Sequence, residues 1–254
     1  RQFAQNELAP YAAEWDAHST FPADAICKMA ELGFLGMIAP PEWGGGGADQ
    51  VAHSLALEEI AAGDAACSTI MSVHNSVGCM PIAAFGNEAQ KERFLRPLAT
   101  GKQLGAFALT EPQAGSDAAA LRVRAEWDGQ AYILNGTKQF ITSGKNADIV
   151  VAFAVTDPQA GKRGITAFIV PTDAPGYSVN RVESKLGQRA SDTAQLGFEN
   201  LRLTPAYRLG EEGAGYKIAL SNLEGGRIGI AAQSVGMAKA ALEAALAYAK
   251  EREA

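Results

Sequence analysis

The chain has 254 residues, of which 47% are hydrophobic and 20% charged, an ordinary composition for a soluble globular protein. Its net charge of −6, with no dense Lys/Arg run, argues against a nucleic-acid binder. No apolar run has the length of a membrane span, and no signal-peptide pattern is present.

Residues 1–102 predict an N-terminal all-helical domain. Apolar residues recur at helical spacing in its first segment, at Phe3, Leu8, Tyr11, Ala12 and Trp15. Pro22 lies where a second helix is expected to begin, and Gly33 follows its end. Further helices are expected from near Ala48 or Asp49, over 65–85 and over 87–99.

Residues 103–207 predict a middle antiparallel β-domain, either a sandwich or a barrel. Val, Ile, Phe, Thr and Tyr become more frequent, and turn residues separate the apolar runs. These turns are expected at Asp128-Gly129, Asn135-Gly136, Gly161 to Gly164 and Pro175-Gly176. Asn135-Gly136 is a strong signal for a two-residue hairpin.

Residues 208–254 predict the beginning of a C-terminal helical domain, with a long helix from about Gly225. The whole chain is therefore expected to be an α+β protein. Its last segment consists of strong helix formers and has neither a Gly cap nor a Pro stop. We therefore expect this helix to continue beyond Ala254.

The segment Phe107-Ala-Leu-Thr-Glu-Pro-Gln-Ala-Gly-Ser-Asp117 combines an apolar run with a tight turn. Such a turn can point backbone N–H groups and hydroxyls at one polar ligand edge. The alternative is a strand connection in which Ser116 and Asp117 cap their own backbone.

A second segment, Lys138-Gln-Phe-Ile-Thr142, offers a flat apolar face in Phe140 and a hydroxyl in Thr142. Residues two apart lie on one face of a strand. A planar heterocycle with polar edges would suit this pair. The alternative is a buried strand aromatic beside a threonine, which is common.

At these residues the chain resembles the acyl-CoA dehydrogenase family. Further motifs agree in order and spacing, so that the resemblance covers essentially all 254 residues. These motifs are Met37-Ile-Ala-Pro-Pro-Glu-Trp-Gly-Gly-Gly-Gly47, Ser72-Val-His-Asn75, Phe85-Gly-Asn-Glu88, Lys185-Leu-Gly-Gln-Arg-Ala-Ser-Asp192 and Gly225-Gly-Arg-Ile-Gly229.

The resemblance implies an FAD site, with the Thr110 hydroxyl near the pyrimidine edge of the flavin and Thr142 donating near N5. The cofactor residues that it implies are Phe107, Ala108, Leu109, Thr110, Gly115, Ser116, Phe140, Ile141 and Thr142. Many family members have Trp where this chain has Phe140, so the stacking face is kept but the indole N–H is lost.

The resemblance also implies that Ser116, Glu224 and Arg227 contact an acyl-CoA substrate. Gly225 and Gly226 lie inside an apparent helix, where each costs about 1 kcal/mol relative to Ala, and glycine would let a ligand pass close to the backbone. The family usually has Asp or Asn at the position of Glu224. The alternative is a surface Glu224–Arg227 pair.

No catalytic residue is assigned. A minority of the family carries the catalytic Glu at the position of Gly226, and most members carry it downstream of the part that this chain covers. Family members continue into a helical bundle that supplies the base, covers part of the FAD and makes most tetramer contacts. A polypeptide ending at Ala254 is therefore expected to lack activity and to hold FAD poorly.

The function implied is flavin-dependent α,β-dehydrogenation of a short or branched-chain acyl-CoA to the trans-2-enoyl-CoA, in fatty acid or branched-chain amino acid catabolism. Electrons would pass to electron-transfer flavoprotein, and the full-length protein would be a homotetramer. The location would be the bacterial cytoplasm or the mitochondrial matrix of a eukaryote. The alternatives are an acyl-CoA oxidase and a non-catalytic flavin or acyl-CoA binding relative.

We predict no metal site, because no two His or Cys residues have the sequence spacing of metal ligands. Cys27, Cys67 and Cys79 are expected to be free thiols in a reducing compartment. His74 is expected in the core. His18 and His53 are expected at the surface.

Overall fold

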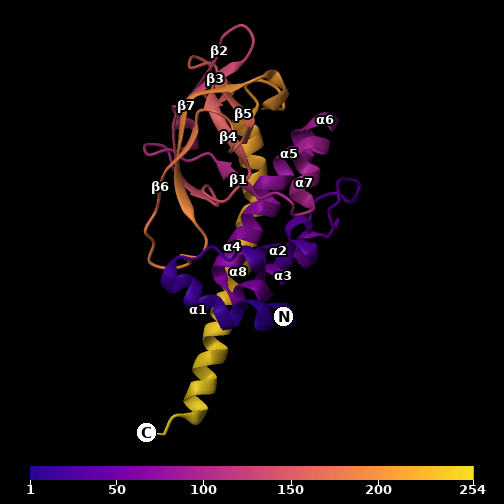
Figure 1. The fold of residues 1–254 in the computed structure, drawn as a ribbon, viewed down its shortest axis with the longest axis vertical. Coiled ribbons are helices and arrows are strands. Elements are labelled where there is room, and N and C mark those ends of the chain that lie inside the picture. The colour runs from indigo at the N-terminus through magenta and orange to yellow at the C-terminus, as the bar shows by residue number, and fades with distance from the viewer. Residues whose placement is uncertain (254) are drawn as a thin grey trace.

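Three parts follow one another along the chain in the computed structural model, which describes residues 1–253 (Figure 1). A cluster of helices comes first, an eight-stranded sheet second and the long helix α8 (Gly215–Glu251) last. In Figure 1, α8 passes behind the sheet and the first helices, and its C-terminal end projects beyond them. The α+β order expected from the sequence is therefore confirmed.

Short π-helical or 3-10 segments, labelled η, connect and extend the α-helices. The other helical elements are η1 (Ala4–Leu8), α1 (Ala9–His18), α2 (Ala23–Glu31), η2 (Phe34–Gly36), η3 (Pro41–Trp43), α3 (Gln50–Gly63), α4 (Ala65–Val73), η4 (His74–Cys79), α5 (Met80–Phe85), α6 (Glu88–Gln90), η5 (Lys91–Leu95), α7 (Arg96–Ala99), η6 (Ala118–Ala120), η7 (Gly161–Gly164) and η8 (Pro205–Tyr207). The strands are β1 (Gly105–Ala108), β2 (Arg124–Trp127), β3 (Tyr132–Thr142), β4 (Ile149–Val155), β5 (Ile165–Pro171), β6 (Tyr177–Val182), β7 (Thr193–Leu203) and β8 (Arg208–Leu209).

Side-chain caps set the starts of the first helices. Asp49 accepts a hydrogen bond from the backbone N–H of Ala52 at 2.8 Å, and Asp64 accepts one from Cys67 at 2.6 Å. Each carboxylate satisfies a backbone N–H group that has no partner within its own helix. The helix expected from near Asp49 is therefore present as α3.

The sheet has the order β6-β7-β3-β2-β4-β5-β8, and β1 pairs with β4 outside this path. Most neighbouring strands are antiparallel, as expected, but β1 and β2 each pair with β4 in parallel. The chain reverses its direction from β2 to β3 and again before β4. For this reason β4 runs in the same direction as β1 and β2. The result is a mixed sheet.

The prediction of a hairpin at Asn135-Gly136 is wrong. Both residues lie inside β3, at a register shift against β7, and the turn between β2 and β3 lies at Asp128-Gly129. The positive φ of Gly136 (+138°) serves a bulge here, and the Asn135 side chain accepts from the Asn200 N–H of β7 at 2.8 Å. Glycine after asparagine supplies the same backbone freedom to a bulge as to a turn.

The sheet is buried on both faces in its centre. Along β4, Val150 and Ala152 pack inside the sheet, whereas Val151 and Phe153 pack against the helices. Both faces of β4 and β5 are apolar for this reason. One face of the sheet therefore packs against helices, including the start of α8, and this contact fixes the sheet relative to α8.

The helix α8 begins ten residues before the expected Gly225, at Gly215. Its first turns bury Ile218 and Ala219 against the sheet, and tertiary packing outweighs the low helix propensity of the glycines. Further along, Gly229 lies where a Cβ would be 2.5 Å from Ser72 Oγ. The absence of side chains at such positions lets α8 approach the neighbouring helices closely.

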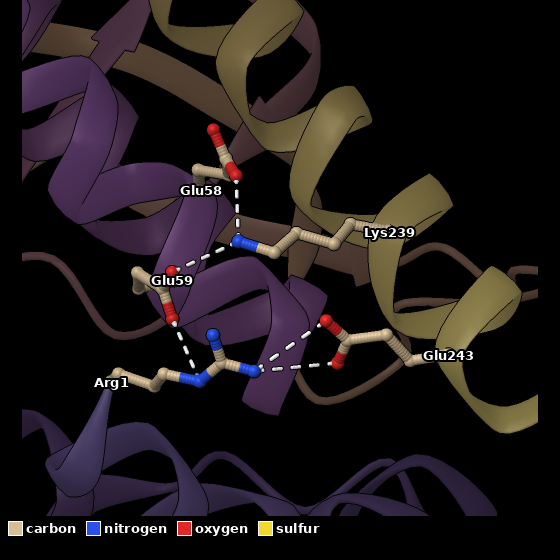
Figure 2. Close-up of polar contacts among 5 residues, drawn as sticks. All are labelled: Arg1, Glu58, Glu59, Lys239 and Glu243. Atoms are coloured by element: carbon tan, nitrogen blue, oxygen red, sulfur yellow. Dashed lines mark hydrogen bonds and ion pairs between the residues drawn. The ribbon is translucent and has the colours of Figure 1, made fainter. Parts of the chain in front are cut away.

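Charged side chains add contacts between α8 and α3, as Figure 2 shows. Lys239 lies 3.1 Å from a carboxylate oxygen of both Glu58 and Glu59. Arg1 lies 3.8 Å from Glu59 and 3.4 Å from Glu243. These side chains remain partly exposed, so solvent screens each pair and its contribution to stability is small. The main contact between α8 and α3 is close backbone packing rather than these ion pairs.

We predict that Gly236→Ala lowers the free energy of unfolding by about 1–3 kcal/mol, because the new Cβ would overlap the carbonyl oxygen of Glu58. Gly225→Ala is the matched control on the same helix, where the nearest atom is 3.9 Å away. The control should raise stability by about 0.5–1 kcal/mol. Urea unfolding measures both, and equal stabilisation by the two variants would contradict this packing argument.

Candidate functional site

A cavity of about 410 Å³ lies where β1, the following loop, the end of β3, the segment 73–77 and α8 meet. Most of the predicted cofactor residues surround it, although they are distant in sequence. Its lining residues are Val73, Val77, Phe107, Leu109, Thr110, Gly115, Ser116, Ala118, Phe140, Ile141, Thr142, Leu220, Leu223 and Arg227. Ala108 does not line it, because its side chain packs in the sheet core.

The loop after β1 is closed by backbone hydrogen bonds between Glu111 and Ala114, at 2.9 and 3.0 Å. Asp117 caps the next turn by accepting from Ala119 N–H at 3.2 Å, as the alternative interpretation of this segment expected. The Ser116 side chain makes no such bond within residues 1–253. This hydroxyl is therefore available at the cavity.

An ion pair with almost no solvent exposure lies beneath this loop. Lys138 Nζ donates to Glu111 Oε1 at 2.8 Å and to the carbonyl oxygen of Leu109 at 3.1 Å. Both charged side chains are at least 98% buried. Glu111 also accepts from the backbone N–H groups of Arg122 (2.6 Å) and Val123 (3.0 Å). Every oxygen of the carboxylate is thus bonded, as a buried charge requires.

Burial lowers the pKa of Lys138 to about 8, and the Glu111 carboxylate acts in the opposite direction by raising it. Desolvation of the ammonium group and attraction by the carboxylate thus oppose each other at this lysine.

Phe140 lies at a bulge in β3. The register with β7 shifts between Lys138 and Ile141, and Phe140 has a φ of +58°, in the left-handed region. An L-residue other than glycine costs about 1–2 kcal/mol in that conformation. The bulge leaves Phe140 62% exposed beside the cavity, whereas side chains of a regular strand point alternately to the two faces of the sheet. Strain of this kind clusters at functional sites.

Three hydroxyl groups of residues that line the cavity have no hydrogen-bond partner in the described part of the chain. They belong to Thr110, Ser116 and Thr142, all of them lining residues. Phe140 and Thr142 reach the same cavity, as expected, although through the bulge rather than along a regular strand face. A flat apolar face beside three free hydroxyls matches a planar ligand with polar edges.

A second, apolar cavity of about 350 Å³ adjoins the first and shares Val73, Val77, Leu223 and Arg227 with it. Its remaining lining residues are Ser72, Ser76, Gly226 and Ile230. Ser76 donates to the Ser72 carbonyl oxygen at 2.6 Å, which leaves the wall mainly apolar. The glycine at 226 widens this cavity, because a Cβ there would lie 3.6 Å from Ser76 Oγ.

Arg227 lines both cavities, whereas Glu224 is exposed and lines neither. Within residues 1–253 no ion pair joins the two side chains, so the alternative of a surface Glu–Arg pair is wrong. The lining residues of both cavities include no carboxylate among those described. In the same part of the chain, Arg227 is the one charged side chain that the two cavities share.

His74 is a core residue, as expected. It contacts the Leu98 carbonyl oxygen at 3.0 Å and accepts from the Gly105 N–H at 2.9 Å, and burial lowers its pKa to about 4. The prediction of a surface His53 is wrong, because this side chain is 1% exposed on α3 and burial lowers its pKa to about 4. His18 is exposed.

Cys27, Cys67 and Cys79 are free thiols, as the sequence predicted. Among the described residues, no group of His, Cys, Asp or Glu side chains is arranged to hold a metal ion. None of the helices within residues 1–253 is both long and apolar enough to cross a membrane.

Sequence reasoning missed two parts of the site. One is the wall formed by Val73, Val77, Leu220 and Leu223, whose apolar spacing is that of any core helix. The other is the Lys138–Glu111 pair. A lysine among alternately buried strand residues is a signal that could have indicated a buried partner.

Family models of the acyl-CoA dehydrogenases match three consecutive parts of this chain. The N-terminal domain matches residues 1–102, the middle domain 106–201 and the C-terminal domain 213–254. The matched ranges follow the order of the helical cluster, the sheet and α8.

Known proteins are similar to this chain along its whole length. An acyl-CoA dehydrogenase of Bacillus subtilis (strain 168) is 50% identical, over 99% of this chain and 66% of its own length. Butyryl-CoA dehydrogenase from Megasphaera elsdenii superimposes with a TM-score of 0.97 at 42% identity, over 100% of this chain and 67% of that one. A chain solved in work on the electron transferring flavoprotein of Acidaminococcus fermentans superimposes with a TM-score of 0.98 at 45% identity, also over 100% of this chain and 67% of that one.

The chain thus spans 66% to 67% of the length of these three proteins. Within that span the fold and the order of all three matched domains agree. The chain therefore belongs to the acyl-CoA dehydrogenase family.

Proposed function

We propose that the protein containing this chain is a flavin-dependent dehydrogenase that converts a short-chain acyl-CoA to the trans-2-enoyl-CoA. The observation that carries this proposal is the cavity at the β3 bulge. It combines eight of the predicted cofactor residues and lies beside an apolar cavity that Arg227 also lines. Membership of the acyl-CoA dehydrogenase family supports the reaction type.

The residues at the bulge suit FAD. Phe140 presents an exposed ring on which a planar isoalloxazine can stack, and Phe107 and Leu109 supply apolar walls. The hydroxyls of Thr110, Ser116 and Thr142 can bond its polar edges. When bound, FAD supplies the hydride acceptor for the oxidation.

The residues of the second cavity suit a short acyl chain. Its walls are apolar, and Gly226 lets a thioester pass close to the α8 backbone. Arg227 stands at the junction of the two cavities and would orient the substrate, together with Ser116. Glu224, exposed on the same helix, would contact the CoA arm outside the cavities. No residue is assigned as the base.

Two relatives support the finer parts of the proposal. The similarity to a butyryl-CoA dehydrogenase supports a short, straight acyl group, and a branched group is proposed on the family resemblance alone. The similarity to a chain solved in work on an electron transferring flavoprotein supports such a flavoprotein as the electron acceptor. A homotetramer is proposed on the family resemblance.

The test is anaerobic addition of butyryl-CoA and isobutyryl-CoA to the FAD-loaded, intact protein. We expect loss of the flavin absorbance and formation of the 2-enoyl-CoA, followed by reoxidation by electron-transfer flavoprotein. Fast reoxidation by dioxygen with release of peroxide would indicate an oxidase instead. An unchanged flavin spectrum with all acyl-CoA thioesters would contradict the proposal.

We predict that Thr142→Ala weakens FAD retention and slows flavin reduction by butyryl-CoA. Loss of one preorganised donor costs about 3 kcal/mol of transition-state stabilisation, or roughly 100-fold in rate. Stopped-flow reduction and the flavin-to-protein ratio measure the effect. Thr137→Ala is the control on the same strand, because Thr137 does not line the cavity. Equal behaviour of both variants would remove Thr142 from the site.

We predict that Gly226→Leu raises the KM for butyryl-CoA by about tenfold or more, because a branched side chain would fill the apolar cavity, at a cost near 1.4 kcal/mol or above. Hexanoyl-CoA should be affected more strongly. Gly225→Leu makes the same change one residue earlier on α8, outside both cavities. Steady-state kinetics with the two substrates would contradict the assignment if both variants were equally impaired.

A further inference from the structure

We propose that Lys138 and Glu111 are positioning residues that hold the two walls of the cofactor cavity in register. This inference rests on the proposed FAD site. One wall is the loop after β1 with Thr110 and Ser116, and the other is the β3 bulge. The ion pair joins them from beneath without itself lining the cavity.

Three consecutive loop residues are tied to two consecutive strand residues. Lys138 Nζ donates to the carbonyl oxygen of Leu109 at 3.1 Å and to Glu111 Oε1 at 2.8 Å. Between these bonds, the backbone N–H of Gln139 donates to the carbonyl oxygen of Thr110 at 2.8 Å. Thr110 therefore cannot shift relative to Phe140 unless these bonds break.

The bulge makes this connection possible. Because the register with β7 shifts between Lys138 and Ile141, the Gln139 N–H is free of the β7 ladder and can bond the loop. The Gln139 side chain bonds Glu183 (2.5 Å) and Gln195 (2.6 Å), which holds the bulge from its other side. The loop thus replaces β7 as the local partner of the strand.

The energetics favour a positioning role over a stabilising one. A buried ion pair is weak support for stability, because desolvation of both charges offsets their attraction. An apolar pair of similar volume would fill the same space, but it would not fix the direction of the contact. The hydrogen bonds of Glu111 to Arg122 and Val123 N–H extend the tether to the far end of the loop.

The decisive variant is K138M/E111Q, in which the charged tether to β3 is lost while the introduced side-chain amide oxygen can still accept from one of the Arg122 and Val123 N–H groups, which bond separate oxygens of Glu111. We expect it to fold, to bind FAD about tenfold or more weakly and to change the visible circular dichroism of bound flavin. Isothermal titration of the apoprotein with FAD gives the affinity without any assay of turnover. At saturating FAD, kcat should fall with little change in the KM for butyryl-CoA.

The matched control is R124M/E126Q, which removes an exposed ion pair from the same sheet (65% and 75% exposed). It should leave FAD affinity and the flavin spectrum unchanged. A folded K138M/E111Q protein with wild-type FAD affinity and dichroism would overturn the positioning role while leaving the proposed function intact. Absence of FAD binding in the wild-type protein would instead overturn the proposed function.

Thermal melting of the apoprotein separates positioning from folding. If K138M/E111Q does not fold, the same titration and dichroism are measured on K138Q. The side-chain amide of this variant, on β3, can still donate a hydrogen bond to the loop. Failure of both variants to fold would show that the pair is required for stability alone and would overturn the proposal.

Discussion

The cavity proposed to hold the cofactor depends on one interruption of regular strand pairing. A continuous β3–β7 ladder would engage the N–H of Gln139 and would turn the Phe140 ring to one side of the sheet. The register shift releases both, so that the backbone bonds the loop at Thr110 and the ring stands exposed beside the cavity. The positive φ of Phe140 is an unfavourable local conformation, and the surrounding tethers hold it in place.

The remaining walls come from helices whose positions the sheet determines. Both faces of the central strands are apolar, so helices must cover one of them, and α8 begins by packing Ile218 and Ala219 there. Glycines at 229 and 236 then let α8 approach α4 and α3 closely. Gly225 and Gly226 differ from these two, because no protein atom lies within 3.5 Å of a Cβ built there. The first pair serves packing, whereas of the second pair Gly226 lines the apolar cavity and Gly225 lies outside both cavities.

Local chemistry was sufficient to predict much of this molecule. The carboxylates of Asp49 and Asp64 cap helices wherever the fold puts them, because a cap bonds its own next turn. The division into helices, sheet and a final helix follows from the change in hydrophobic period, which needs no knowledge of distant contacts. The motifs at 107–117 and 138–142 likewise carry their side-chain types with them, so eight of nine predicted cofactor residues reach one cavity.

Only the tertiary structure decided what depends on partners far along the chain. Asn135-Gly136 suits a turn or a bulge equally, and pairing with β7 selects the bulge. His53 is buried because α3 packs at that face, which its sequence neighbours do not reveal. Lys138 and Glu111 are 27 residues apart, and their pairing exists only once the loop folds over β3. The sequence by itself determined the local elements and the chemistry of the site, whereas long-range packing determined which groups are buried together, because burial and pairing are properties of neighbours in space.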